Sequence, residues 1–164
     1  MNVARRGVEV GCCCLAFLAA LAGPGVRRSS EAGPVATCYG QNVTITGSGT
    51  INGTSGPDVI LDSDNADVIN GNSGDDIICG GCFRGVAWGG SGNDFDFYVE
   101  ERTADGGSGN DYLYGGADGD ELLGGSSNDT LVDDYGYSLT LNGGSGHDSC
   151  EPDGDDDTLS NSRR

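Results

Sequence analysis

Large apolar residues recur at nine-residue intervals from residue 53 onward, and most of them stand two places after an aspartate. The recurrence is plainest in three consecutive segments, 106–114, 115–123 and 124–132, which we read as approximate copies of the pattern G-G-x-G-x-D-x-U-x, where U is large and apolar. The glycines favour a turn, because glycine adopts positive φ without steric cost. The apolar residue in the eighth place favours a short strand with one inward side chain. The pattern therefore predicts stacked turns and strands around a thin core.

The same unit can be counted from residue 53 to residue 160, although some copies are degenerate. The sixth place is an aspartate in nine units: Asp58, Asp67, Asp76, Asp94, Asp111, Asp120, Asp129, Asp148 and Asp157. The eighth place supplies the predicted core residues: Ile60, Ile69, Ile78, Leu113, Leu122, Leu131, Cys150 and Leu159. Four units depart from the pattern: Gly80–Trp88 with Gly85 in sixth place, Gly89–Phe97 with Asp96 in eighth place, the eight-residue Tyr98–Asp105, and the ten-residue Asp133–Asn142.

The segments that flank the repeats have different compositions. Residues 1–22 combine Arg5-Arg6, an apolar run and small residues, which is typical of a secretory signal peptide. The run is too short and too rich in Gly and Ala to favour a membrane span. Residues 23–37 are expected to be a linker, or the rest of the signal region if cleavage follows Ala36 instead of Ala22. Residues 38–52 are β-prone and are expected to cap the first coil, and residues 161–164 form a short polar tail. The chain is therefore expected to be secreted and extracellular.

The composition alone would suggest disorder. Thirty-one glycines and a formal charge of −18 are typical of segments that bury too little apolar surface to fold. Disorder does not explain why the aspartates keep a fixed spacing, or why an apolar residue follows most of them by two places. The chain has no lysine and only scattered arginines, which excludes a basic surface for nucleic acid. The acidic side chains instead require a cation.

The nonapeptide units resemble the repeats of the RTX, or haemolysin-type calcium-binding, family. The resemblance implies an all-β fold, a right-handed parallel β-roll in which two units make one coil. It also implies that Ca²⁺ lies between stacked turns, held by turn carbonyls and by the sixth-place aspartates. Calcium takes about six to eight oxygen ligands, so the nine aspartates are the expected metal ligands. EF-hand loops fit less well, because a loop from Asp62 lacks the sixth-place glycine and one from Asp153 ends on Arg164.

Two units per coil place every second turn on the same edge of the roll. One edge then carries an unbroken row of sixth-place aspartates: Asp58, Asp76, Asp94, Asp111, Asp129 and Asp148. The other edge carries only Asp67, Asp120 and Asp157, and no two of these belong to neighbouring turns. We therefore expect the first edge to offer five gaps between stacked aspartates, and the second edge to bind calcium poorly.

Four cysteines remain after the predicted signal peptide: Cys38, Cys79, Cys82 and Cys150. An even number in a secreted protein favours disulfides, with three possible connectivities. We prefer Cys38 with Cys79, which would fasten the cap to the roll. Cys79-x-x-Cys82 lacks the βαβ setting of a redox motif, and Cys150 in an eighth place can be a small buried hydrophobe.

The motifs of common enzymes are missing from the sequence. His147 is the single histidine, and neither H-E-x-x-H nor G-x-S-x-G occurs. The leading interpretation is a non-enzymatic, secreted calcium-binding protein that folds on binding the ion. The alternative is an adhesive module that binds a protein or glycan through aromatic residues beside the core positions: Trp88, Phe95, Phe97, Tyr98, Tyr112 and Tyr114.

Overall fold

The structure is a computed structural model that describes residues 36–62, 68–79, 85–99, 103–116, 120–133, 139–152 and 157–161. These residues all belong to one compact unit, Pro34–Arg164. The predicted signal peptide, most of the predicted linker, Asp67 and Cys82 lie outside the described residues. Within the described ranges there is no helix that is long and apolar enough to cross a membrane.

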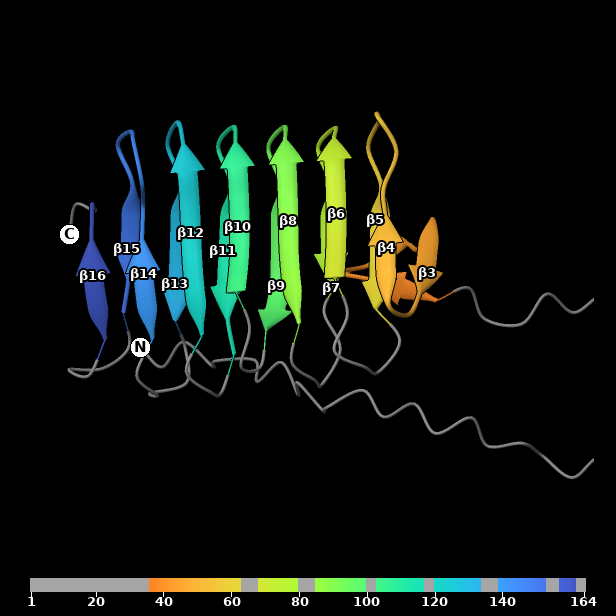
Figure 1. Cartoon of the computed structure of the whole chain (residues 1–164), viewed down its shortest axis with the longest axis horizontal. Helices are drawn as coiled ribbons and strands as arrows, with labels where there is room; N and C mark the ends of the chain where they lie inside the picture. Colours follow the sequence, from red (N-terminus) through yellow and green to blue (C-terminus); the bar gives the residue numbers. More distant parts are fainter. Residues whose placement is uncertain are drawn as a thin grey trace, which may run out of the picture. The chain divides into compact units, whose positions relative to one another are not determined.

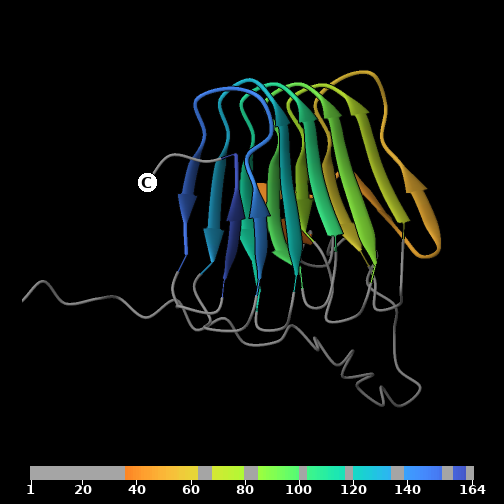
Figure 2. The ribbon, with the colours of Figure 1, turned by 60° about the vertical axis from the view of Figure 1, so that its left-hand side comes forward.

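Two parallel sheets of seven strands each make up the roll. The even sheet contains β4 (Thr50–Asn52), β6 (Val68–Ser73), β8 (Val86–Ser91), β10 (Thr103–Ser108), β12 (Glu121–Ser126), β14 (Thr140–Asn142) and β16 (Thr158–Ser160). The odd sheet contains β3 (Ile45–Gly47), β5 (Val59–Asp62), β7 (Ile77–Cys79), β9 (Phe95–Val99), β11 (Tyr112–Gly115), β13 (Thr130–Asp133) and β15 (Ser149–Glu151). The chain alternates between the sheets, so each coil adds one strand to each (Figures 1 and 2). The predicted all-β parallel roll is confirmed.

Equivalent places of the repeat stack on one another along both sheets. Leu113 pairs in register with Leu131, a step of 18 residues. The eight-residue unit shortens the step to 17 between Phe95 and Tyr112, and the ten-residue unit lengthens it to 19 between Thr130 and Ser149. Because both irregular units lie on the same edge of the roll, the opposite edge keeps its register through all six turns.

Inward residues from most strands of the two sheets fill the space between them. The predicted eighth-place residues are buried, except that Leu159 is partly buried. The core forms two clusters, one of Ile51, Ile60, Ile69, Ile78 and Ala87, and one of Ala104, Leu113, Leu122, Leu131, Leu139, Leu141 and Cys150. The division falls where Asp96 takes the register position between Ile78 and Leu113.

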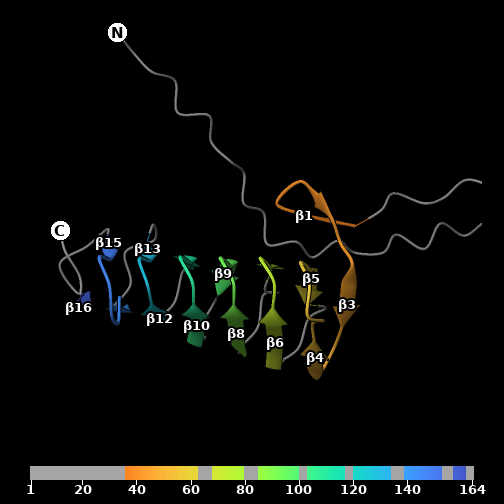
Figure 3. The same cartoon turned by 90° about the horizontal axis from the view of Figure 1, so that it is seen from above.

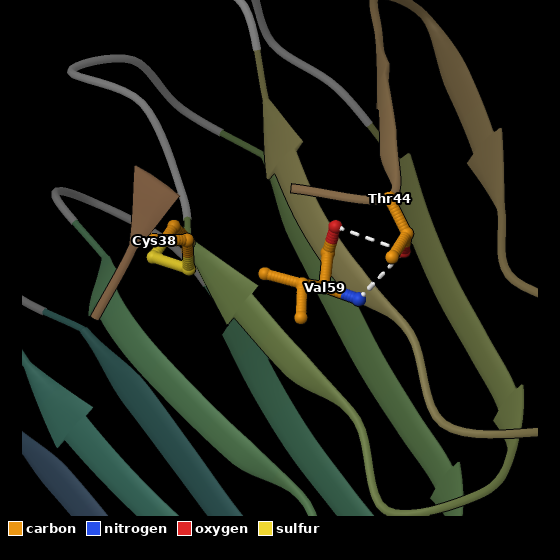
Figure 4. The surroundings of a disulfide bond; sticks show 4 residues. Cys38, Thr44 and Val59 are labelled. Carbon is orange, nitrogen blue, oxygen red and sulfur yellow. Dashed lines mark hydrogen bonds between the residues drawn. A yellow bond between two sulfur atoms is a disulfide. The ribbon is translucent and has the colours of Figure 1, made fainter. Parts of the chain in front are cut away.

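The N-terminal strands attach a small hairpin to the roll. β1 (Thr37–Cys38) and β2 (Gln41–Asn42) pair antiparallel, and a disulfide joins Cys38 to Cys79 of β7. The hydroxyl of Thr44 accepts a hydrogen bond from the N–H of Val59 (2.9 Å) and donates one to its carbonyl (3.3 Å) (Figure 4). The predicted cap, residues 38–52, thus contains this hairpin except for Thr37, together with β3 and β4, the first strand of each sheet. Figure 3 shows the hairpin strand β1 beside the two rows of strands.

Candidate metal centre

The turns that lead from the even sheet to the odd sheet form one continuous edge, at the top of Figure 1. We call this the Gly-Asp edge and define it by residues 53–58, 71–76, 89–94, 106–111, 124–129 and 143–148. Its second and fourth places have positive φ from the second turn onward, for example +94° at Gly107 and +132° at Gly109. A Cβ built on Gly109 would lie 1.6 Å from the carbonyl oxygen of Gly92 in the preceding turn. Glycine is required there because the backbones of successive turns are in direct contact.

The sixth-place aspartates of this edge form a hydrogen-bonded ladder. The backbone N–H of each of the first five aspartates donates to the Oδ1 atom of the aspartate one coil later, with N···O distances of 2.8 to 3.0 Å. The row consists of Asp58, Asp76, Asp94, Asp111, Asp129 and Asp148, and each of them is buried. The structure therefore places these six predicted site residues in one unbroken stack, in the register that the sequence predicts.

The second carboxylate oxygen of four of these aspartates has no hydrogen-bond donor among the described residues. These atoms are the buried Oδ2 oxygens of Asp76, Asp94, Asp111 and Asp129. Each faces the first glycine of its own turn: a Cβ on Gly71 would lie 2.6 Å from Asp76 Oδ2 and 2.4 Å from the carbonyl oxygen of Gly89 in the next turn. The missing side chain thus leaves room where an acidic oxygen and a backbone carbonyl oxygen converge.

Burial makes these carboxylates harder to ionise. Desolvation raises the pKa of Asp94 to about 6 and the pKa of Asp111 to about 7. The backbone hydrogen bond that each accepts lowers its pKa, and the charges of neighbouring aspartates in the row raise it. The pKa values of Asp76 and Asp129 are raised by the same burial. A row of buried, mutually repelling carboxylates is stabilised by a cation that replaces the lost solvation.

The donor set fits a hard cation such as Ca²⁺, which binds carboxylate and carbonyl oxygens. No group of three or more His, Cys, Asp or Glu side chains converges within the described ranges. Acidic side chains alone therefore cannot complete a coordination shell, and main-chain carbonyls must supply the rest. The close packing of the glycine turns provides such carbonyls beside each Oδ2 atom.

A second ladder runs along the exposed side of the same edge and was not predicted. Here the fifth-place side chain accepts a hydrogen bond from the backbone N–H one coil later, at 2.8 to 3.1 Å, through the series Asp75, Asn93, Asn110, Asn128 and His147. In this ladder the N–H of the later turn donates, whereas in the aspartate ladder the N–H of the earlier turn donates. The two ladders together join each turn to the next through both its fifth and its sixth place. The signal in the sequence is the recurrence of asparagine in the fifth place.

The opposite edge does not bring its predicted aspartates together. Asp120 Oδ2 accepts the N–H of Gly116 in its own turn (2.9 Å). Leu139 takes the register position between Asp120 and Asp157, and its N–H donates to Asp157 Oδ1 (3.1 Å). Asp157 Oδ2 is buried without a donor among the described residues, but the neighbouring turn presents Leu139 there. Asp67 lies outside the described ranges.

The described cysteines and aromatic residues that the sequence analysis named lie outside the Gly-Asp edge, in the core and on the two sheets. Cys79 is in the disulfide with Cys38, the preferred pairing, and Cys150 is buried in the core as expected. Phe95 and Tyr112 stack on the odd sheet with ring centroids 5.0 Å apart. Trp88, which is 40% exposed, belongs to β8 of the even sheet. Trp88 therefore lies on the other sheet from Phe95 and Tyr112, because alternate strands belong to opposite sheets.

Comparison with known proteins agrees with this geometry. A family model described as RTX calcium-binding nonapeptide repeat (4 copies) matches residues 52–81, 103–131 and 140–159. The stretches between these matches contain most of the degenerate units, including the motif-less 98–102. No curated protein and no solved structure matches the chain.

Proposed function

Since its repeat region belongs to the RTX calcium-binding nonapeptide repeat family, we propose that this chain is a secreted protein that binds Ca²⁺ along the Gly-Asp edge and folds as it does so. The carboxylates of Asp76, Asp94, Asp111, Asp129 and Asp148, with carbonyl oxygens of the adjoining turns, hold the ions in the gaps between turns. Calcium supplies the positive charge that these gaps need.

The observation that carries the proposal is the set of four buried Oδ2 oxygens for which the described part of the chain supplies no donor. A buried carboxylate oxygen without a hydrogen bond is strongly destabilising. Four of them in equivalent places of one row indicate a built feature of the repeat. The Oδ1 bonds fix the orientation of each carboxylate, and the glycine in the first place of each turn leaves space beside Oδ2. These Oδ1 bonds join neighbouring turns, so the carboxylates have this orientation only when the turns are stacked. Ion binding and stacking of the turns are therefore coupled.

Folding that depends on calcium follows from the thinness of the core. Each strand contributes about one inward side chain, and the formal charge of the chain is −18. Repulsion along the row opposes stacking of the turns, whereas each ion bound only by stacked turns stabilises the folded state by mass action. Several bound ions together contribute the stabilisation that the thin apolar core alone does not provide.

Export of the chain is proposed from its N-terminal sequence and its cysteines. We expect residues 1–22 to act as a signal peptide, residues 23–37 as a linker, residues 38–52 as a cap and residues 53–160 as the calcium-binding roll. A disulfide between Cys38 and Cys79 suits an oxidising, extracellular compartment, where calcium is also available. The proposed function is binding, without catalysis.

Isothermal titration of the calcium-depleted protein with CaCl₂ tests the proposal. Wild type should bind several ions, and Asp94→Asn should bind fewer, because Asp94 borders two gaps. Glu121→Gln is the matched control, since Glu121 is exposed on the even sheet and its loss changes the charge equally. Absence of calcium binding by wild type, or equal losses in the two variants, would contradict the proposal.

A further inference from the structure

The first turn of the Gly-Asp edge differs in sequence from the five that follow. It reads Gly53-Thr54-Ser55-Gly56-Pro57-Asp58, with threonine in the second place. The later turns have Asn72, Gly90, Gly107, Gly125 and Gly144 there, all with positive φ. No residue of 53–58 has positive φ. The first turn therefore follows a different backbone path, although its aspartate occupies the same place in the row.

Thr54 supplies two hydrogen bonds that the later turns lack. Its backbone N–H donates to Asp58 Oδ2 at 2.6 Å, and its hydroxyl donates to the same oxygen at 2.9 Å. Asp58 Oδ1 lies 3.4 Å from the hydroxyl of Thr44, in the segment before β3, and shares the single proton of that hydroxyl with the carbonyl oxygen of Val59. Both oxygens of Asp58 thus have donors, whereas the Oδ2 atoms of Asp76 and its successors up to Asp129 have none among the described residues.

The carboxylate of Asp58 is also displaced from the glycine of its turn. A Cβ on Gly53 would lie 3.2 Å from Asp58 Oδ2, compared with 2.4 Å for the equivalent pair Gly106 and Asp111. The same Cβ on Gly53 would still lie 2.4 Å from the carbonyl oxygen of Gly71 in the next turn, as close as the equivalent distance at Gly71. The first gap therefore keeps its carbonyl oxygen, but its acidic oxygen has turned toward Thr54.

We propose that Thr54 takes the place of a cation at the first turn, so that Asp58 caps the row and the gap between Asp58 and Asp76 does not bind calcium. This inference rests on the proposed function. The row then offers four ion gaps, bordered by Asp76, Asp94, Asp111, Asp129 and Asp148, instead of the five that six aspartates would give. The end of the roll that carries the Cys38–Cys79 disulfide is closed by hydroxyl and amide donors, which need no ion.

Counting bound calcium by native mass spectrometry, with calorimetry as a second readout, tests this assignment in the full chain. Asp58→Asn should bind as many ions as wild type, because Asp58 borders no ion gap. Asp76→Asn should lose one ion, since Asp76 borders one gap, and Asp111→Asn should lose two. Thr54→Gly, which restores the glycine of the later turns, should gain one ion. Circular dichroism in calcium confirms that each variant is folded.

Other outcomes would overturn the inference. If Asp58→Asn lost one ion and Asp76→Asn lost two, the first gap would be an ion site like the rest. An unchanged count in folded Thr54→Gly would show that the threonine does not exclude the ion. These results would leave calcium binding itself intact, whereas a wild-type protein without bound calcium would contradict the proposed function together with this inference.

Discussion

The Oδ1 atom of Asp129 accepts a hydrogen bond of 2.9 Å from the backbone N–H of Asp111, while the Oδ2 atom of Asp111 is buried without a donor among the described residues. Each inner aspartate of the row therefore has two roles. One oxygen fastens its turn to the preceding turn, and the other contributes to an ion gap. A change at one aspartate is expected to weaken both the stacking of the coils and the binding of calcium.

Replacing Asp111 by Ala should destabilise the calcium-loaded protein more than replacing Asp120 by Ala. Asp111 borders two gaps, and a site filled at ten times its dissociation constant stabilises the fold by about 1.4 kcal/mol. The Oδ2 atom of Asp120 accepts the N–H of Gly116 within its own turn, a bond worth about 1 kcal/mol. Thermal melts of both variants in a calcium titration compare the two edges. Equal losses would mean that the opposite edge also holds ions.

Magnesium should replace calcium poorly in refolding. Mg²⁺ requires a near-octahedral shell at about 2.1 Å and releases its waters reluctantly. The Gly-Asp edge instead presents backbone carbonyls held in place by stacked turns. Refolding midpoints should therefore lie at much higher magnesium than calcium concentration, and coincident midpoints would contradict the prediction.

Ser127→Gly should stabilise the roll. Ser127 is in the fourth place of its turn with φ of +91°, where the neighbouring turns have Gly109 and Gly146. A non-glycine residue in this region is disfavoured by about 1 kcal/mol or more, so the variant should melt a few degrees higher in calcium. Gly109→Ser is the reciprocal control and should lower the melting temperature, because its Cβ would collide with the carbonyl of Gly92. A lower melting temperature for Ser127→Gly would show that the serine is not strained.

Acid should favour the folded state in the presence of a chelator. The pKa values of Asp94 and Asp111 rise in the fold from 3.8 to about 6 and about 7. The folded chain therefore binds these protons more tightly than the unfolded chain. This stabilisation is complete below about pH 4 and is lost as the pH rises through 6 and 7. With saturating calcium the trend should reverse, because protons and Ca²⁺ compete for the carboxylates. In chelator, circular dichroism should show more β-sheet signal at pH 5 than at pH 8, where the chain is unfolded, and denaturant titrations in calcium at the same two pH values measure the opposite trend. Less β-sheet signal at pH 5 than at pH 8 in chelator would contradict the prediction.

The sequence predicts the stacking of the roll because one nine-residue period sets both the turn and the core. Ile78 and Leu113 follow their aspartates by two places, and both are buried. The row from Asp58 to Asp148 could be predicted because the short and long units lie on the opposite edge. Ala87 and Leu139 are core residues that the pattern did not identify, since the units that contain them lack the aspartate that marks the eighth place.

The hydrogen bonds within the turns could not be predicted from spacing. Asp58 and Asp76 have the same place in the repeat, yet Thr54 donates to one and nothing described donates to the Oδ2 atom of the other. The difference accompanies the backbone path of the first turn, which lacks the positive φ of the later turns in both the second and the fourth place. The fifth-place ladder was missed for a similar reason, because Asn93 and Asn110 are ordinary turn residues until the coils are stacked in register.

Far-ultraviolet circular dichroism of the chain without residues 1–36, recorded in chelator and again after calcium is added at neutral pH, tests whether the roll folds on binding calcium. The spectrum in chelator should be that of an unfolded chain, and the β-sheet signal should rise cooperatively as the ion gaps fill. Asp111→Asn should need more calcium for the same gain. A β-sheet spectrum and a thermal melt that are the same in chelator and in calcium would contradict the account.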